Sequence, residues 1–397
     1  LYILMYNIGK YVYKGDNKMR DDIIRDSVLK DSSILIPEAL KLYKALDIQT
    51  VSPITKVAIA DFMMIVNSYY SNLIEDIIVS PLEIEKYEKI EEVKGNNEGV
   101  AYLIAEKKIN DRLNSSIKTN IFSREFILFA HKNLYENIEN TTENSVVPGK
   151  IRDIAVMVGS HIPPASEYIK NYLYDFEKAY SLENRDEITS LALFAAAHHR
   201  LAWIHPFADG NGRAARLIST AATRKIGIDE GGIWSLPRAI CKYRRQYYTM
   251  LENADKTDNN GLLNQDGLAK FCKFFLTVCN LEVLFIKNLL EFKTLENNVM
   301  RIANSIAKNK LDLAEDLKKI LIYVILKGEI VRGKIPELLN KPERTTRDIT
   351  KKLIINNLLK SVTPKSPLRL NLPVKYGAML FPGIFPYSLE RDIIESD

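Results

Sequence analysis

The chain has 397 residues, of which 46% are hydrophobic and 26% are charged, and its formal net charge is +5 at pH 7. This composition is ordinary for a soluble globular protein with two or three domains, and so mild a charge does not by itself indicate nucleic acid. The five histidines and three cysteines form no C-x-x-C or H-E-x-x-H arrangement, which argues against a structural zinc site. With so few cysteines and an apolar stretch at residues 1–9 too short to span a membrane, we expect a cytoplasmic protein with no membrane segment.

In chain order, the predicted elements are almost all helices. Residues 1–115 form an N-terminal helical region, with one helix at about 58–78 and a long polar helix over 84–113 that is interrupted at 95–99. Residues 116–280 form a helical core, in which a Pro-Gly turn at Pro148 introduces a short strand.

The last third of the chain has a different pattern. A connecting helix over 281–309 leads to a separate unit at 310–397. There, three helices are followed by an extended arm with two prolines, which is the pattern of a winged helix-turn-helix. The expected bounds are 313–326, 331–339 and 345–356 for the helices and 362–371 for the arm.

The most informative segment runs from His205 to Arg216 and reads HPFADGNGRAAR. Before it, an apolar helix over about 189–204 must end, because Pro206 disfavours a helical conformation in the residue that precedes it. Phe207 is predicted to plug the core and fix the loop. The segment therefore places His205 at the end of a buried helix.

The second half of this segment predicts an anion site. Gly210 and Gly212 allow a tight turn around Asn211, after which a new helix begins. A glycine-rich turn at a helix N-terminus binds anions. Arg213 and Arg216 lie three residues apart, so both guanidiniums face the same side of that helix. Together these features indicate a polyphosphate ligand.

The run H-P-F-x-D-G-N-G-R-x-x-R resembles the signature of the Fic family. Most members of that family resemble nucleotide transferases, which move AMP from ATP to protein hydroxyls. The resemblance implies a mainly α fold, with a helical Fic core and a β-hairpin flap. It makes ATP the substrate and Mg²⁺ the cofactor, with His205 the general base and Asp209 the metal ligand. It also assigns the phosphates to Gly210, Asn211, Gly212, Arg213 and Arg216. The chemistry agrees, because imidazole is a common base near pH 7 and a carboxylate suits Mg²⁺.

Two further stretches resemble parts of the same family. Val156, Met157 and Val158 resemble the flap that positions a target segment, although an ordinary hairpin would have the same pattern. Tyr247 and Tyr248 resemble the segment that closes the nucleotide pocket, while their spacing is equally typical of a core-facing helix. His198, on the face of the helix that leads to His205, is predicted to be a buried structural residue rather than a second base.

Near the N-terminus, Ser71 and Glu75 lie four residues apart on one helical face. They resemble the inhibitory motif [ST]-x-x-x-E-[GN] of the family, which implies that Glu75 pairs with Arg216 and blocks the terminal phosphate. Asp76 departs from the motif, because Gly or Asn is usual there, and so leaves the end of this helix in question.

The function that follows is a protein adenylyltransferase, autoinhibited by Glu75, that modifies an unknown target protein and to some extent itself. Three alternatives stay open: removal of AMP, transfer of another phosphate-containing group, and DNA binding by the C-terminal unit. A homodimer is also compatible with the sequence. DNA binding is favoured by eight basic against two acidic residues between 341 and 371. The basic residues are Lys341, Arg344, Arg347, Lys351, Lys352, Lys360, Lys365 and Arg369.

Overall fold

The structure is a computed structural model that describes residues 35–45, 50–87, 97–115, 119–136, 138, 146–229, 231–257, 263–308 and 310–396. The apolar stretch at 1–9, the rest of the chain up to residue 34, and part of the predicted helix interruption at 95–99 lie outside these described residues.

Helices dominate the described residues, so the prediction of a mainly α fold is confirmed. From the N-terminus to the motif, the elements are α3 (Ile36–Ala45), α4 (Pro53–Ile74), α5 (Pro81–Lys86), α6 (Glu98–Asn114), α7 (Arg124–Tyr135), the 3-10 helix η2 (Ser166–Tyr168), α8 (Ile169–Tyr180) and α9 (Glu187–Ile204). They are followed by α10 (Asn211–Ile226), α11 (Leu236–Lys242), α12 (Arg244–Asp255), α13 (Gln265–Leu290) and α14 (Phe292–Ala307).

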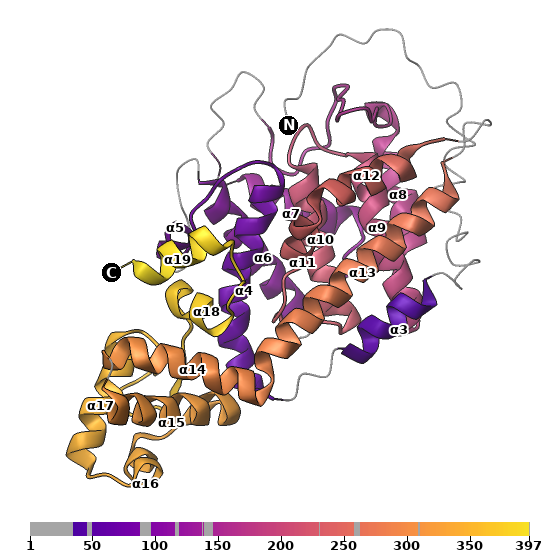
Figure 1. Cartoon of the computed structure of the whole chain (residues 1–397). Helices are drawn as coiled ribbons and strands as arrows, with labels where there is room; N and C mark the ends of the chain where they lie inside the picture. The colour runs from indigo at the N-terminus through magenta and orange to yellow at the C-terminus, as the bar shows by residue number, and fades with distance from the viewer. Residues whose placement is uncertain are drawn as a thin grey trace.

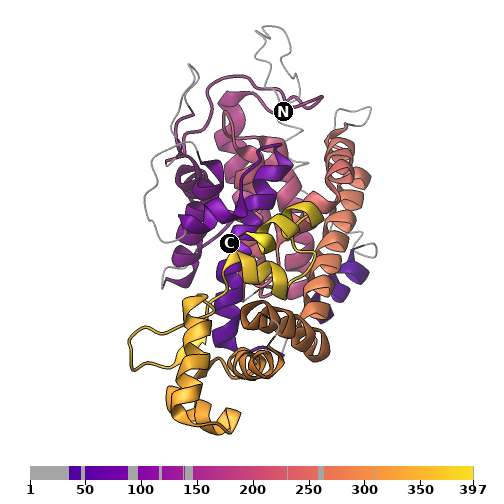
Figure 2. The same ribbon diagram turned by 60° about the vertical axis from the view of Figure 1, so that its left-hand side comes forward.

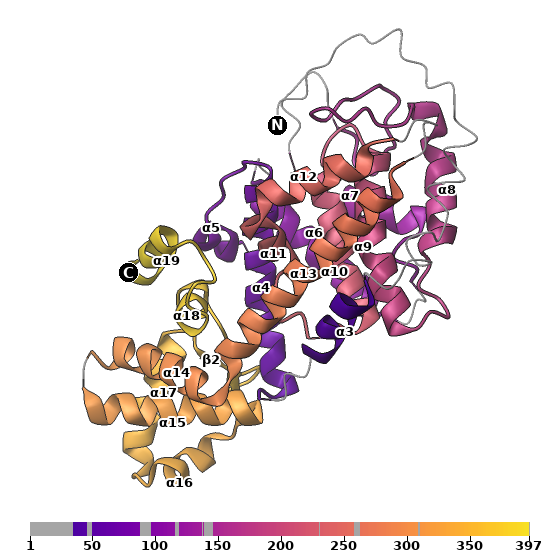
Figure 3. The ribbon, with the colours of Figure 1, turned by 45° about the vertical axis from the view of Figure 1, so that its right-hand side comes forward.

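The centre of the helical core is α9, which is apolar around almost its whole circumference and is buried along nearly its full length. It packs against α8, α10 and α13, while α4 packs against α6 and α11 (Figure 1). Further round the core, α3 lies beside α13 (Figure 3). Because α9 and α10 are adjacent in space and in sequence, the short segment that joins them is held at the centre of the fold.

The chain then forms a C-terminal lobe, residues 311–370, which extends from the core at one end (Figure 2). Its elements are α15 (Leu311–Lys327), β1 (Glu329–Ile330), the 3-10 helix η3 (Arg332–Lys334), α16 (Ile335–Leu339), α17 (Glu343–Ile355), β2 (Leu359–Lys360) and β3 (Leu368–Leu370). The strands form an antiparallel sheet in the order β1-β3-β2, in which Leu359 pairs with Leu370 and Ile330 with Leu368. Three helices and an extended arm are therefore present close to the expected positions.

Two expectations about the helices differ from the structure. The prediction of a single helix over 281–309 is wrong. Instead, α13 continues to Leu290, the helix is interrupted at Glu291, and α14 follows. The helix predicted at 58–78 is α4, which starts five residues earlier and ends at Ile74. Pro53 stands in the first turn of α4, where its missing N–H costs nothing, and Ser52 caps the helix by accepting from the Thr55 N–H at 3.1 Å.

After the lobe, two unpredicted helices return to the core: α18 (Val374–Leu380) and α19 (Tyr387–Glu395). α18 packs against α14 and α4, and it approaches α4 so closely that a Cβ on Gly377 would lie 2.3 Å from the Phe62 ring. Among the described residues, no helix is long and apolar enough to cross a membrane.

Candidate active site

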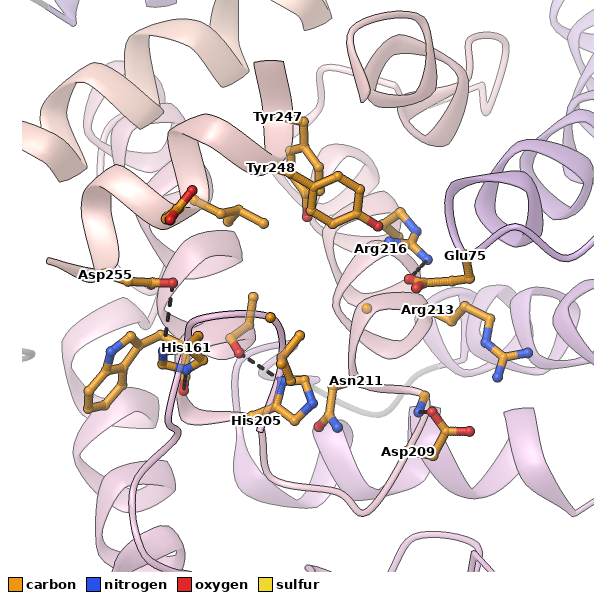
Figure 4. Close-up of a pocket in the computed structure, with 18 of the residues that line it drawn as sticks. Glu75, His161, His205, Asp209, Asn211, Arg213, Arg216, Tyr247, Tyr248 and Asp255 are labelled. Carbon is orange, nitrogen blue, oxygen red and sulfur yellow. Dashed lines mark hydrogen bonds and ion pairs between the residues drawn. The ribbon is translucent and has the colours of Figure 1, made fainter. Parts of the chain in front are cut away.

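A cavity of about 500 Å³ opens where α4, α9, α10 and α12 meet (Figure 4). Its lining includes all the motif residues from Asp209 to Arg213, together with His205, Arg216, Glu75, Tyr247 and Tyr248. The structure thus brings together residues that are up to 180 positions apart in sequence (75 to 255). One end of the cavity holds Arg213, Arg216 and Glu75, and we call it the arginine end. The other end holds His205, His161 and Asp255, and we call it the histidine end.

At the histidine end, His205 is the C-cap of α9 and takes the left-handed conformation, with φ of 49°. Its Nδ1 lies 3.2 Å from the Ala202 carbonyl oxygen, and a carbonyl can only accept, so Nδ1 carries the proton. The other ring nitrogen, Nε2, is then free to accept one. Burial, and next the neighbouring His161, lower the pKa of His205 from its ordinary 6.5, which keeps the imidazole neutral at pH 7.

Arg152 and His131 hold the turn that follows His205, and motif analysis missed the role of both. The buried Arg152 donates to the His205 carbonyl at 2.8 Å and to Pro164 and Ile154 carbonyls, which ties the turn to the segment after the Pro148 turn. His131 accepts from the Gly149 N–H at 3.0 Å, so its Nε2 donates to the Asp209 carbonyl at 3.1 Å.

The phenyl ring of Phe207 stacks on His131 with 3.7 Å between ring centroids, and the residue is 1% exposed, as its predicted core role requires. The Asn211 side chain closes the same turn, accepting from the Phe207 N–H at 2.9 Å and donating to the Phe207 carbonyl at 2.8 Å. Asn211 therefore shapes the turn in addition to lining the cavity.

Gly210 is required by two independent constraints. Its φ is 75°, and an added Cβ would lie 2.3 Å from the Tyr135 ring. The Tyr135 hydroxyl donates to Asp209 Oδ2 at 2.9 Å and accepts from Arg213 Nη2 at 2.8 Å. Tyr135 and His131 lie four residues apart on one buried face of α7. This spacing is the sequence signal that could have pointed to their role in the site.

At the arginine end, the guanidinium of Arg216 forms hydrogen bonds with Ser71 of α4 and with Glu75 at the end of that helix. Its Nε donates to Ser71 Oγ at 2.9 Å, and its Nη2 donates to the Ser71 carbonyl at 3.0 Å and to Glu75 Oε1 at 2.6 Å. The predicted pair of Glu75 with Arg216 is present, and Ser71 orients the same guanidinium. Burial alone would raise the pKa of Glu75, but the charge and hydrogen bond of Arg216 outweigh it and lower that pKa, so the carboxylate is ionised.

Asp76 forms the end of α4 without the expected Gly or Asn. Its φ is 60°, and the backbone closes a Schellman motif in which the Asp76 N–H donates to Leu73 and the Ile77 N–H to Asn72. Asp tolerates the left-handed region better than most residues. Its carboxylate forms a two-oxygen pair with Arg244 of α12, at 2.6 and 2.5 Å. The departure from the motif therefore keeps the helix end in place.

The predicted tyrosines and the flap occupy the remaining walls. Tyr247 lines the cavity but is 3% exposed, and its hydroxyl bonds to His198 Nε2 at 2.8 Å; Tyr248 donates to the Ile74 carbonyl at 3.1 Å. The other nitrogen of His198 bonds to Ser219 at 2.7 Å, which gives His198 the buried structural position expected of it.

The predicted flap strand is only one antiparallel bridge, between Val158 and His161, around the left-handed Gly159. Met157 and Val158 face the cavity, whereas Val156 is buried. Arg152 donates to the carbonyls of Ile154 and Pro164, which lie in sequence on either side of this bridge.

A helical core that presents this turn, two buried arginines and a histidine at a helix end is the arrangement that the motif predicted. Residues 121–222 match the model of the Fic/DOC family. Residues 121–222 are therefore similar to the Fic/DOC domain.

Several known proteins are similar to parts of the chain. Protein adenylyltransferase Fic from Nematostella vectensis is 31% identical over 112 residues, which cover 28% of this chain and 24% of that protein. The Drosophila melanogaster protein of the same name is 30% identical over 164 residues, 41% of this chain and 30% of that one. The match thus spans less than a third of the length of these curated relatives.

Among solved structures, a Fic family protein from Desulfovibrio desulfuricans G20 is 17% identical with a TM-score of 0.48, over 87% of this chain and 96% of that chain. Fic-1 from C. elegans is 21% identical with a TM-score of 0.45, over 66% of this chain and 72% of that chain.

Proposed function

We propose that this protein is a protein adenylyltransferase that transfers AMP from ATP to a hydroxyl side chain of a target protein. The observation that carries the proposal is the position of His205, whose unprotonated Nε2 belongs to the same cavity as the glycine turn and the two motif arginines. The matched relatives named protein adenylyltransferase Fic support the same reaction.

In this reaction the target hydroxyl oxygen attacks the α-phosphorus of ATP. The bond from that phosphorus to the oxygen bridging to the β-phosphate breaks, pyrophosphate leaves, and the hydroxyl proton passes to Nε2 of His205. The N–H groups at the start of α10 and the two arginines would stabilise the negative charge that develops on the leaving pyrophosphate. Met157 and Val158 would hold the target segment near His205.

The residues present are suited to Mg²⁺. Each oxygen of Asp209 already accepts one hydrogen bond, from the Gly210 N–H or from Tyr135, and each keeps a lone pair for a cation. Mg²⁺ takes most of its ligands from phosphates and water, so one carboxylate suffices. When bound with ATP, the metal would neutralise phosphate charge. We expect Asp209→Ala to lose the Mg²⁺-dependent transfer activity, and a Mg²⁺ titration of activity is the measurement.

Parallel incubations with α-³²P-labelled and γ-³²P-labelled ATP test the activity. Label on protein only from the α-position is the expected result. Label from the γ-position would indicate phosphoryl transfer instead, and loss of label from premodified protein would indicate AMP removal. Self-modification can serve as the readout while the target protein is unknown.

We further propose that Glu75 inhibits this activity by holding Arg216, which would otherwise receive the terminal phosphate of ATP. The three free cysteines support a reducing, cytoplasmic location, which fractionation of cells that express the protein would test.

We propose a second, compatible function for the C-terminal lobe: a winged helix that binds DNA. The order of its helices and strands and the exposed Arg344, Lys351 and Lys352 of α17 favour it. Three of the eight basic residues are already paired: Lys341 with Asp316, Arg347 with Glu343 and Arg369 with Glu329. The charge available to phosphates is therefore smaller than the sequence suggests.

A gel shift with mixed genomic DNA tests this second function. We expect a shift that weakens as salt rises and that is reduced in the double variant Lys351→Ala, Lys352→Ala. Absence of any shift at low salt would leave the lobe as a protein-docking module.

A further inference from the structure

Arg213, the other motif arginine, is also occupied by a carboxylate of this chain. Its guanidinium is almost completely buried, and its Nη1 forms an ion pair with Oε2 of Glu98. Nη1 also lies 3.5 Å from Asn72 Oδ1, and Nη2 donates to the Tyr135 hydroxyl at 2.8 Å. Its Nε has no hydrogen-bond partner among the described residues.

We propose that Glu98 is a second inhibitory carboxylate, which occupies Arg213 as Glu75 occupies Arg216. The two pairs are closely alike. Each joins an arginine that is at most 4% exposed to a glutamate that is 26% to 30% exposed, and all four residues line the same cavity. The proposal rests on the proposed function, since it concerns the site that would take the triphosphate of ATP.

The two glutamates come from helices that are bound to each other. Glu98 is the first residue of α6, whose N-terminus is capped by Asn97. Ser68 of α4 donates to the Gly99 carbonyl at 2.6 Å, and Asn72 of α4 donates to the Glu98 carbonyl at 3.4 Å. The start of α6 and the end of α4 thus form one wall, which presents one carboxylate to each arginine.

Glu98 can leave Arg213 without loss of the arginine's position. Two neutral groups also hold the guanidinium: the Tyr135 hydroxyl accepts from Nη2, and Asn72 Oδ1 lies 3.5 Å from Nη1. In the structure, the two guanidiniums face two carboxylates, so these four side chains together offer a polyphosphate a net charge close to zero. Binding of a nucleoside triphosphate must displace Glu98 before it gains Arg213, and Glu75 before it gains Arg216.

Calorimetry of Mg²⁺-ATP binding to the full chain tests the proposal with Glu98→Gln. The amide keeps the shape of the side chain and removes its charge, so we expect the Kd for ATP to fall about threefold to tenfold. Glu125→Gln is the matched control, because Glu125 also lies in the first turn of a helix and pairs with an arginine, Arg112, but does not line the cavity. Its Kd should equal that of the wild type.

The gain should depend on the arginine and should add to the effect of Glu75. The double variant Glu98→Gln, Arg213→Ala should lose the gain, with a Kd above that of Glu98→Gln alone, and Glu75→Gly with Glu98→Gln should bind ATP more tightly than either single variant. A folded Glu98→Gln protein, with the melting temperature of the wild type, whose Kd is unchanged or higher would overturn the proposal. If Glu98→Gln does not fold, Glu98→Ala is measured under the same criteria.

Separate measurement of AMP transfer distinguishes the two proposals. Tighter ATP binding without any transfer would leave the role of Glu98 standing and contradict the adenylyltransferase. If AMP transfer proceeds but no Glu98 variant changes the ATP affinity, the adenylyltransferase proposal stands and the role of Glu98 is contradicted.

Discussion

The two ends of the cavity differ in their readiness for a ligand. At the histidine end, His205 has its proton on Nδ1 and an unprotonated Nε2, and the turn behind it is fixed by Arg152 and His131. At the arginine end, both guanidiniums are oriented but already bound to carboxylates. The histidine end is therefore assembled, while the arginines that would bind a polyphosphate are occupied. The following predictions test that difference, from the largest effect to the smallest.

The first prediction isolates the histidine end. His205→Ala should lower AMP transfer by about 10²- to 10⁴-fold, because it removes the group that accepts the hydroxyl proton. The Kd for ATP should stay within about twofold of wild type, since the arginine end is untouched. Labelled AMP transfer and calorimetry measure the two quantities. Wild-type transfer by a folded His205→Ala protein would remove His205 from the mechanism.

The second prediction isolates Arg216 without leaving a carboxylate unpaired. Between Glu75→Gly and the double variant Glu75→Gly, Arg216→Ala, ATP affinity should fall about tenfold to a hundredfold, as expected for loss of a charged hydrogen bond. The affinity for AMP should change much less, because Arg216 is assigned to the end of the triphosphate. Calorimetry with both nucleotides decides, and equal losses would place Arg216 at the α-phosphate.

The third prediction opens the arginine end. Glu75→Gly should raise the rate of self-modification with ATP about tenfold, because ATP then meets an uncompensated cation. Glu75→Gln is the control that removes the charge and keeps the shape. The gain should vanish when Arg216→Ala is added. If neither Glu75 variant is more active than wild type, release of AMP from premodified protein would show whether Glu75 serves removal instead.

The fourth and smallest effect concerns the end of α4. Asp76→Asn keeps a residue that accepts the left-handed conformation but breaks the exposed pair with Arg244, so ATP affinity should rise by no more than about threefold. That rise should disappear in high salt, which screens the same pair in the wild type. Asp76→Ala, strained at φ of 60°, should have the larger effect. If both variants have the same ATP affinity, the conformation of this helix end plays no part in the inhibition.

Much of the site could be predicted from the sequence because its residues lie in contiguous motifs. Residues 205–216 fix a helix end, a turn and a helix start through local backbone chemistry alone, and Ser71 and Glu75 share one face of one helix. Glu98, Tyr135 and His131 were not identified, since each reaches the site only through the packing of α6 or α7 against α10. No local pattern distinguishes such residues from other polar residues on helices.

The bounds of elements were less predictable where an apolar pattern continued past a structural stop. Ile77 and Ile78 extend the apolar run of α4, yet the helix ends at Ile74 because Asp76 takes a left-handed conformation. The break at Glu291 and the return of α18 to α4 likewise depend on contacts between distant parts of the chain. The boundaries of the four proposed domains stay a prediction.

The position of α4 has a consequence for dividing this protein into fragments. The helix has 22 residues and spans about 33 Å. Thr55, in its first turn, donates to the Val324 and Ile325 carbonyls of α15, while Glu75 at its other end holds Arg216. A fragment cut before residue 311 would leave the first turn of α4 without these acceptors and would expose the Phe62 face that α18 covers. The helical core and the C-terminal lobe therefore share α4, and a truncated core would be unsuited to a test of the proposed inhibition by Glu75.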